Sequence, residues 1–341
     1  MKIAIDAMGG DYAPEEIVKG AVEAAKEYDA EIILVGNSSL IKEHLGDREL
    51  KNISIVHCDQ YIAMDEKPAV ALRKKKDASI AVATRLVKEG RADAVISAGS
   101  TGAQMASSLI TLGRLKNVQR PAIAAILPGL KGNIVLLDAG ANTDCRPENL
   151  VEFAVMGSVY AEKVLGISKP KVGLLNIGTE PTKGDLLTRE AYQLLQKVPI
   201  NFYGNIEARD ILTGNVDVVV CDGFVGNSLL KFGEGIGKIF YSLLQDAVKS
   251  SFLTKLGGFL LLSSFKEIKR KLDWQEYGGA PLLGIKGISI ICHGSSKSTA
   301  VKNAVRVAIK CIKDDFVKVL SDFLETGYVS DKEKVKLCHR H

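Results

Sequence analysis

Cysteine and histidine are scarce in this chain of 341 residues, and their spacing excludes several classes of protein. The six cysteines form no CxxC pair and no metal-finger pattern, and several lie in or beside apolar runs, where a free thiol packs as a small hydrophobic group. The five histidines show no obvious catalytic triad. We therefore expect no zinc module, and a reducing cytoplasm fits this cysteine usage best.

Long apolar runs and nucleotide-binding motifs are also missing. No apolar stretch reaches the ~18 residues of a membrane-spanning helix, and the chain enters a strand-like run at Lys2–Asp6 without a signal peptide. Gly9-Gly10 lacks the GxGxxG spacing and there is no P-loop, so a tightly bound NAD or ATP is not indicated. A net charge of +5 is too small at this length to indicate nucleic acid. We expect a soluble, cytoplasmic protein that could still contact a membrane surface.

Size and apolar content indicate a large core. With 46% hydrophobic residues, no internal repeat and no Pro- or Ser-rich linker, the chain is expected to form one elaborated domain, 1–341, or two intimately packed lobes. Only the tail, 329–341, is expected to fray.

Short aliphatic runs alternate with helical patterns along the chain. The predicted strands are Lys2–Asp6, Glu31–Val35, Ile53–His57, Asp93–Ser97, Ala122–Leu127, Asn133–Asp138, Lys171–Ile177, Val216–Cys221 and Ile288–Cys292. The predicted helices include Glu15–Tyr28, Ala78–Glu89, Gly102–Leu112, Glu148–Leu165, Leu186–Lys197 and Ser298–Leu320. This alternation predicts an α/β fold with a mostly parallel sheet covered by helices on both faces.

Loops that combine small residues with a polar side chain follow many of these strands. They are Asp6–Asp11, Ser97–Gly102, Asp138–Asn142, Asn176–Gly184, Cys221–Asn227 and His293–Ser296. Ligands bind at the carboxyl ends of parallel strands, so these loops are the expected site. In Asn176–Gly184, two glycines allow close approach of a ligand and Lys183 adds a cation beside a helix start, which suits an anion. The alternative is a set of ordinary turns with an exposed lysine.

The same loops resemble those of one enzyme family. The matching motifs are Ile5–Asp11, Asp138–Asn142, Cys221–Asn227, Gly279–Gly284 and His293–Ser296. Over essentially the whole chain they resemble the bacterial acyl-carrier-protein:phosphate acyltransferases of phospholipid synthesis, the PlsX family. Two positions depart from the family pattern, since Ser100 replaces the usual Asn and Ala208 the usual Gly.

The resemblance implies both a fold and an activity. The implied fold is three-layer α/β/α and Rossmann-like, akin to isocitrate dehydrogenases and phosphate acetyltransferases, and assembled as a homodimer. The implied reaction transfers a fatty acyl group from acyl carrier protein to inorganic phosphate. The acyl phosphate would then feed a downstream glycerol-3-phosphate acyltransferase.

Attack of phosphate on a thioester needs an anion cradle, donors for the developing oxyanion and a channel for the acyl chain. Phosphate is ionised at neutral pH and a thiolate leaves readily, so neither a strong base nor a covalent nucleophile is required. We assign Lys183 to charge neutralisation and Asn227 to side-chain hydrogen-bond donation. The further phosphate or substrate contacts are expected to be Gly9, Gly10, Ser100, Thr101, Gly102, Asn142, Gly178, Gly226, His293 and Ser295.

Three side chains in these loops also admit structural roles. A lone histidine at a strand end more often orients a loop than transfers a proton, and both roles stay open for His293. Asp138 and Asp222 are expected to cap and hold their loops, because two carboxylates among glycines lack a convincing metal-ligand set. We expect no metal and no cofactor.

Residues 228–274 are predicted to form a protruding helical hairpin with an apolar tip. The stems are expected to make the dimer, and the tip to contact an anionic membrane surface. The expected contacts with membrane or carrier protein are Leu253, Leu256, Leu260, Leu261, Lys266, Lys269, Arg270 and Lys271. The alternative is that the whole hairpin serves dimer packing.

Other interpretations stay open beside the acyltransferase. An oxidoreductase of the isocitrate dehydrogenase type is disfavoured, because neither metal-binding carboxylates nor a dinucleotide fingerprint is evident. A non-catalytic membrane-surface scaffold would retain only the fold. The basic runs Arg73–Lys76 and Lys266–Lys271 could steer an acidic carrier protein or simply face water.

Chelators and nicotinamide cofactors are expected to leave acyl phosphate formation unchanged, because the expected anion site uses backbone dipoles and a lysine. The check is turnover of palmitoyl-charged acyl carrier protein with phosphate, measured with and without EDTA or NAD. Loss of turnover on chelation that added metal restores would contradict this prediction.

Overall fold

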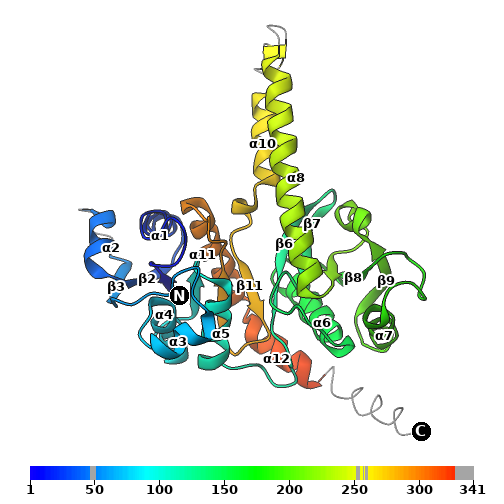
Figure 1. The fold of residues 1–341 in the computed structure, drawn as a ribbon, viewed down its shortest axis with the longest axis horizontal. Coiled ribbons are helices and arrows are strands. Elements are labelled where there is room, and N and C mark those ends of the chain that lie inside the picture. Colours follow the sequence, from blue (N-terminus) through cyan, green and yellow to red (C-terminus); the bar gives the residue numbers. More distant parts are fainter. Residues whose placement is uncertain (47–50, 251–253, 256, 258–259, 327–341) are drawn as a thin grey trace.

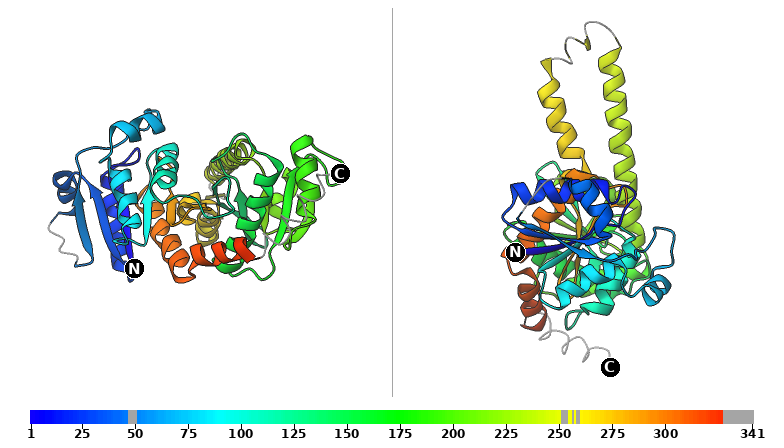
Figure 2. Two further views of the ribbon diagram at one scale, coloured as in Figure 1. Left: turned by 90° about the horizontal axis from the view of Figure 1, so that it is seen from below. Right: turned by 90° about the vertical axis from the view of Figure 1, so that its left-hand side faces the viewer.

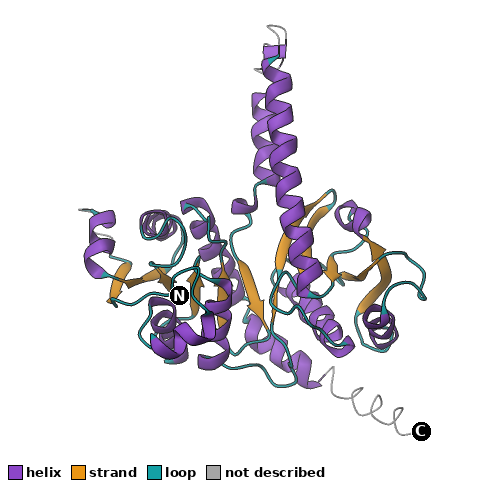
Figure 3. Ribbon diagram, viewed as in Figure 1, coloured by secondary structure: helices purple, strands orange, loops and turns teal. Residues whose placement is uncertain are grey.

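The computed structural model describes residues 1–46, 51–250, 254–255, 257 and 260–326. Its strands form two sheets in one elongated body, and a long helical hairpin projects from the middle of that body (Figure 1). Helices enclose the strands of both halves (Figure 3). The predicted alternation of strands and helices is confirmed, with the strands divided between two sheets instead of one.

The first sheet has seven strands in the order β3-β2-β1-β4-β12-β11-β5. They are β1 (Lys2–Asp6), β2 (Glu31–Gly36), β3 (Ile53–His57), β4 (Ala94–Ser97), β5 (Ala122–Ile123), β11 (Ala280–Leu283) and β12 (Ile288–Ile291). One face packs on α1 (Glu15–Glu27), α2 (Ser38–Leu45) and α11 (Ser298–Lys313). The other packs on α3 (Pro68–Lys74), α4 (Ser79–Lys88) and α5 (Thr101–Thr111). Side chains alternate between the two faces, as Ile3 and Ile5 against Ala4 show.

The second sheet has five strands in the order β6-β7-β10-β8-β9. They are β6 (Ala125–Gly129), β7 (Gly132–Leu137), β8 (Lys171–Asn176), β9 (Asn201–Glu207) and β10 (Val218–Val220). One face packs on α6 (Pro147–Lys163), α7 (Leu186–Leu195) and α12 (Phe316–Thr326). The other packs on the short helix η1 (Ala208–Thr213) and the first turns of α8 (Gly223–Lys249).

The two sheets meet where the chain passes from β5 to β6. β11 is antiparallel to both β5 and β12, so β5 runs in the same direction as β12 and the other parallel strands. The N–H of Ala139, just after β7, donates to the carbonyl of Ile123, the last residue of β5, at 2.9 Å. The carboxyl ends of the two sheets therefore come together at this junction.

Some predicted elements are corrected by the structure. The strands β9 and β11 and the helices α2 and α3 were not predicted. The predicted helix Ser298–Leu320 is wrong, because the chain breaks at Asp315, whose φ of 46° is left-handed, and α12 starts anew at Phe316. Apolar spacing continues across that break, so periodicity alone did not reveal it.

The hairpin consists of α8 and α10 (Leu262–Leu272), with the short helix η2 (Trp274–Glu276) at its base. The two long helices stand apart in the right-hand view of Figure 2. Large apolar side chains of α8 face solvent in this single chain: Phe232, Ile236, Ile239, Phe240 and Leu243 are 52–68% exposed. At the tip, Leu260 and Leu261 are also exposed, whereas Leu253 and Leu256 lie outside the described residues. No helix in the described part of the chain is long and apolar enough to span a bilayer.

Candidate active site

The buried carboxylate of Asp138 organises the loop that follows β7. Its Oδ1 accepts backbone N–H groups of Ile123, Gly140 and Ala141 at 3.0–3.2 Å. Its Oδ2 accepts both the backbone N–H and the side-chain amide of Asn142, at 2.7 and 2.9 Å. One carboxylate thus fixes its own loop and the end of β5. This confirms the loop-holding role predicted for Asp138.

The first turn of α8 packs directly on this loop. A Cβ on Gly226 would lie 1.9 Å from the carbonyl oxygen of Asp138, so only glycine fits. The carboxylate of Asp222 caps the helix by accepting the N–H of Val225 at 2.9 Å. Asn227 follows on the exposed side of that turn, with its side chain against Gly140. Cys221, which ends the predicted strand Val216–Cys221, is buried.

A second buried aspartate arranges the loops of the seven-stranded sheet. Asp6 ends β1, accepts a hydrogen bond from the Ser97 hydroxyl at 2.7 Å, and accepts the N–H of Met8. Ser97 Oγ in turn accepts the N–H of Gly99. A Cβ on Gly9 would lie 2.6 Å from the Asp6 carboxylate, so glycine is required at the point where these loops touch.

The His293–Ser296 loop joins the same group. The N–H of Asp11 donates to the carbonyl of Gly294 at 2.8 Å. Nδ1 of His293 accepts the N–H of Ser295 at 3.1 Å and lies 2.8 Å from its hydroxyl. These bonds shape the loop, so the geometry favours orientation of the loop over proton transfer at Nδ1.

Burial raises the pKa of both Asp6 and Asp138, and the hydrogen bonds that each carboxylate accepts oppose that rise. Both groups act as acceptors for several N–H or O–H donors, which suits the ionised form. Among the described residues, no group of three or more His, Cys, Asp or Glu side chains is arranged to hold a metal.

Lys183 lies in a tight turn beyond β8. Its N–H donates to the carbonyl of Glu180 at 3.1 Å, and its own carbonyl accepts the Asn176 side-chain amide at 3.1 Å. The side chain is exposed, and its stem lies beside Gly178. The Glu180 carbonyl also accepts the side-chain amide of Asn205, in β9, at 2.8 Å. Asn205 was not among the expected site residues, because its strand, Asn201–Glu207, mixes polar and apolar residues and was not predicted.

The helices that begin near these loops differ in which side chains accept hydrogen bonds from their first backbone N–H groups. Asp185 caps α7 by accepting the N–H of Thr188, and Asp222 caps α8. The N–H of Ser298, at the start of α11, donates to Glu16 Oε2 at 2.7 Å. By contrast, no side chain of the described residues caps α5, which begins after Ser100. The helices α1 and α4 also begin without a side-chain cap. Unfilled N–H groups at a helix start attract anions, so the start of α5 is one of those that suit a phosphate.

The expected site residues therefore form neighbouring groups. Gly9, Gly10, Ser100, Thr101, Gly102, His293 and Ser295 lie at the carboxyl edge of the seven-stranded sheet. Asn142, Gly178, Lys183, Gly226 and Asn227 lie at that of the five-stranded sheet, where β8 and β10 are adjacent. Met105 and Leu109 of α5 and Leu229 and Leu230 of α8 pack on one shared apolar cluster. The two groups are thus built around a common core at the junction of the sheets.

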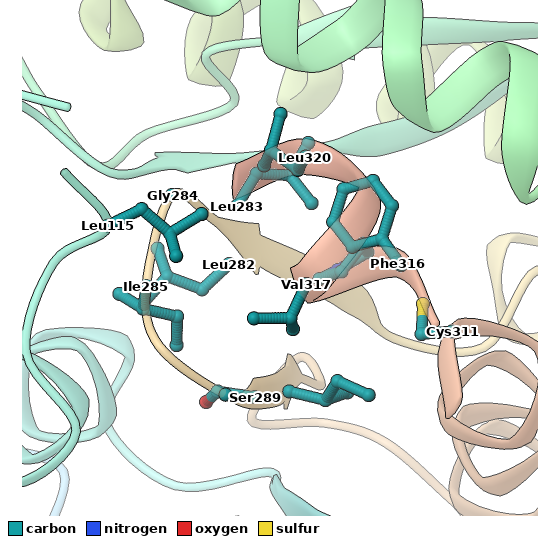
Figure 4. Close-up of a pocket in the computed structure, with 13 residues that line it drawn as sticks. Leu115, Leu282, Leu283, Gly284, Ile285, Ser289, Cys311, Phe316, Val317 and Leu320 are labelled. Carbon is teal, nitrogen blue, oxygen red and sulfur yellow. The ribbon is translucent and has the colours of Figure 1, made fainter. Parts of the chain in front are cut away.

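The pocket in Figure 4 lies away from the glycine-rich loops. Leu282, Leu283, Phe316 and Leu320 are among its lining residues, which surround the amino-terminal end of β12 (Figure 4). Its volume of about 10 Å³ has room for a single water molecule. It is a packing defect at the edge opposite the glycine-rich loops.

Comparison with known proteins gives matches along most of the chain. Residues 1–319 match the family described as "Fatty acid synthesis protein". The phosphate acyltransferase of Moorella thermoacetica is 56% identical over 339 residues, which is 99% of each chain. The phosphate acyltransferase of Heliobacterium modesticaldum is 55% identical over 327 residues, covering 95% of this chain and 98% of its own.

Solved structures show the same architecture. A phosphotransacetylase from Streptococcus pyogenes superposes with a TM-score of 0.63 at 20% identity, covering 92% of this chain and 94% of its own. A branched-chain phosphotransacylase from Enterococcus faecalis V583 gives 0.57 at 17% identity, covering 91% and 98%. At these identities the likeness shows the fold alone, and it confirms the predicted three-layer α/β/α, Rossmann-like class.

Asp138→Asn is expected to destabilise the protein by roughly 2–4 kcal/mol, because either orientation of the amide places an NH₂ donor against backbone N–H donors. Thermal unfolding measures the loss. Asp222→Asn is the matched control, since asparagine caps a helix about as well as aspartate. Equal melting temperatures for the two variants would show that the Asp138 carboxylate does not hold the junction.

Proposed function

The chain belongs to the fatty acid synthesis protein family, and we propose that it transfers a fatty acyl group from acyl carrier protein to inorganic phosphate. One observation carries this proposal: two phosphate acyltransferases are more than half identical to it over nearly their full lengths. Such identity also disfavours the oxidoreductase and the scaffold considered from the sequence.

The reaction needs few specialised groups. A phosphate oxygen attacks the thioester carbonyl carbon, the C–O bond forms and the C–S bond breaks. The products are acyl phosphate and the thiolate of the carrier protein, which takes up the proton that hydrogen phosphate loses when it is acylated. Placement of the phosphate and stabilisation of negative charge on the carbonyl oxygen are the main tasks left to the protein.

The uncapped start of α5 supports a phosphate position at Ser100, Thr101 and Gly102. Backbone N–H groups there carry the positive end of the helix dipole. Lys183 supplies a mobile positive charge, and Asn227 supplies a neutral donor for a phosphate or thioester oxygen. Both side chains are exposed at the carboxyl edge of the five-stranded sheet, Lys183 in a loop and Asn227 in the first turn of α8, where they can meet a substrate.

A basic surface beside α5 suits the acidic carrier protein. Pro68, at the start of α3, lies against Gly102, since a Cβ on that glycine would be 2.8 Å from the proline ring. Arg73, Lys74 and Lys76 are exposed, whereas Lys75 pairs with Glu66 at 2.6 Å. Complementary charge here would bring the carrier protein to the phosphate position. Arg270 and Lys271 of α10 are exposed and form a second candidate contact.

The hairpin suits two further roles. The exposed apolar face of α8 supports a homodimer in which a second copy covers that face. The apolar tip with flanking lysines supports peripheral contact with an anionic membrane on its cytoplasmic side. Acyl phosphate would then be released beside the downstream glycerol-3-phosphate acyltransferase.

Lys183→Ala and Asn227→Ala are each expected to lower kcat about 10²–10³-fold, because each removes one charge-stabilising contact. Both residues are exposed, so the melting temperature should be unchanged. The measurement is acyl phosphate formation by the purified variants. Lys197→Ala, an exposed lysine beyond the far end of α7, is the control and should keep normal turnover. A variant with near-normal turnover would remove its residue from the mechanism.

Replacing Leu253, Leu256, Leu260 and Leu261 with serine is expected to abolish co-sedimentation with anionic liposomes, because the tip loses its apolar surface. Dimerisation and turnover with soluble substrate should persist. Phe240→Ser with Ile236→Ser on the α8 stem is the counterpart, expected to weaken the dimer by sedimentation velocity. Unchanged liposome binding by the tip variant would refute membrane contact at the tip.

A further inference from the structure

Asn205 is a buried amide beneath the turn that carries Lys183. It lies in β9, is 3% exposed, and donates through Nδ2 to the carbonyl oxygen of Glu180 at 2.8 Å. The same carbonyl accepts the N–H of Lys183. The first residue of the turn is therefore tied to a strand of the sheet.

The last residue of the turn is tied to the neighbouring strand. Asn176, which ends β8, donates through Nδ2 to the carbonyl of Lys183 at 3.1 Å. Gly184 follows with φ of 94°, and a Cβ there would lie 2.4 Å from the Asn176 oxygen. Because β8 and β9 pair in parallel, the two asparagines hold the turn between them from one rigid surface.

The side-chain amide of Asn205 has one buried oxygen that is left unpaired within the described part of the chain. Among the described residues, its Oδ1 has no hydrogen-bond partner. A buried acceptor without a partner costs stability, and an apolar side chain of similar volume would avoid that cost. The amide is therefore best explained by what its Nδ2 holds.

We propose that Asn205 is a positioning residue for the acyl transfer: it fixes the turn Glu180–Lys183 so that the Lys183 ammonium meets the phosphate. This inference rests on the proposed function, in which that ammonium neutralises phosphate charge. A turn fixed in advance orients the lysine before the phosphate binds, so less ordering accompanies binding.

Asn205→Leu is the direct test, because it fills the same space without a donor. The Glu180 carbonyl keeps the Lys183 N–H as its partner, so no acceptor is left unpaired. The expected result is a fall in kcat/KM for phosphate of roughly 10–100-fold, the size typical of a misplaced contact. KM for acyl carrier protein should change less than about twofold, and the melting temperature should not fall. Asn205→Ala gives the same comparison should leucine not pack.

Asn201→Ala is the matched control. Asn201 lies at the start of the same strand and also donates through Nδ2 to a backbone carbonyl, that of Lys169, at 2.9 Å. That carbonyl is far along the strand from the Lys183 turn, at the amino end of the sheet. Its loss should change phosphate kinetics less than about twofold.

A double variant separates positioning from general stability. If Asn205 acts through Lys183, Asn205→Leu should add no further loss of turnover in the Lys183→Ala background. Additive losses, or equal changes in the kinetics of both substrates, would overturn the inference. Normal phosphate kinetics in Asn205→Leu beside an impaired Lys183→Ala would overturn it while leaving the proposed function intact. Full activity of Lys183→Ala would instead refute the proposed role of the lysine, and the inference with it.

Discussion

The Asp138 carboxylate is the constraint on which the two halves of the molecule depend. It accepts hydrogen bonds from the end of β5 in one sheet and from the loop after β7 in the other. The same loop forms the surface on which the first turn of α8 lies, and contact is so close that only glycine fits at position 226. A shift of this one side chain would move both strand ends and the helix that carries Asn227. Its burial, which raises the pKa, is tolerated because five donors surround it.

Asp6 holds loops of the seven-stranded sheet in a similar way, through the hydroxyl of Ser97. Ser97 connects the aspartate to the Gly99 amide, so the loops after β1 and β4 are held together. In each sheet a buried aspartate at or just after a strand end accepts several hydrogen bonds. Glycines let the neighbouring chain segments approach it closely. The protein's own carboxylates also occupy the starts of α7, α8 and α11, whereas no side chain of the described residues caps the start of α5. A helix start that already holds one of the protein's own carboxylates is unfavourable for a second anion.

Much of this arrangement could be predicted from the sequence, because it depends on local patterns. Apolar runs followed by small and polar residues located loops that lie at the carboxyl edges of the two sheets, and Asp138 was expected to hold its loop. The contacts of Glu16 with Ser298 and of Asn205 with Glu180 could not be predicted, since they join residues 282 and 25 positions apart. The division into two sheets was missed for the same reason. β5 and β6 lie on either side of Ala124 within a single apolar run, and only strand pairing separates them.

With the hairpin tip at a membrane, as proposed, the length of α8 would set the distance between the acyl transfer site and the lipid. From Asn227 to the end of the helix at Lys249 the rise is ~33 Å, at 1.5 Å per residue. An extended fatty acyl chain is shorter than this. With the tip at a membrane, as proposed, an acyl phosphate formed near Asn227 could not place its tail in the bilayer while its head remained in the site. Product transfer would therefore be a separate step, and a receiving protein that reaches into the gap would determine its rate.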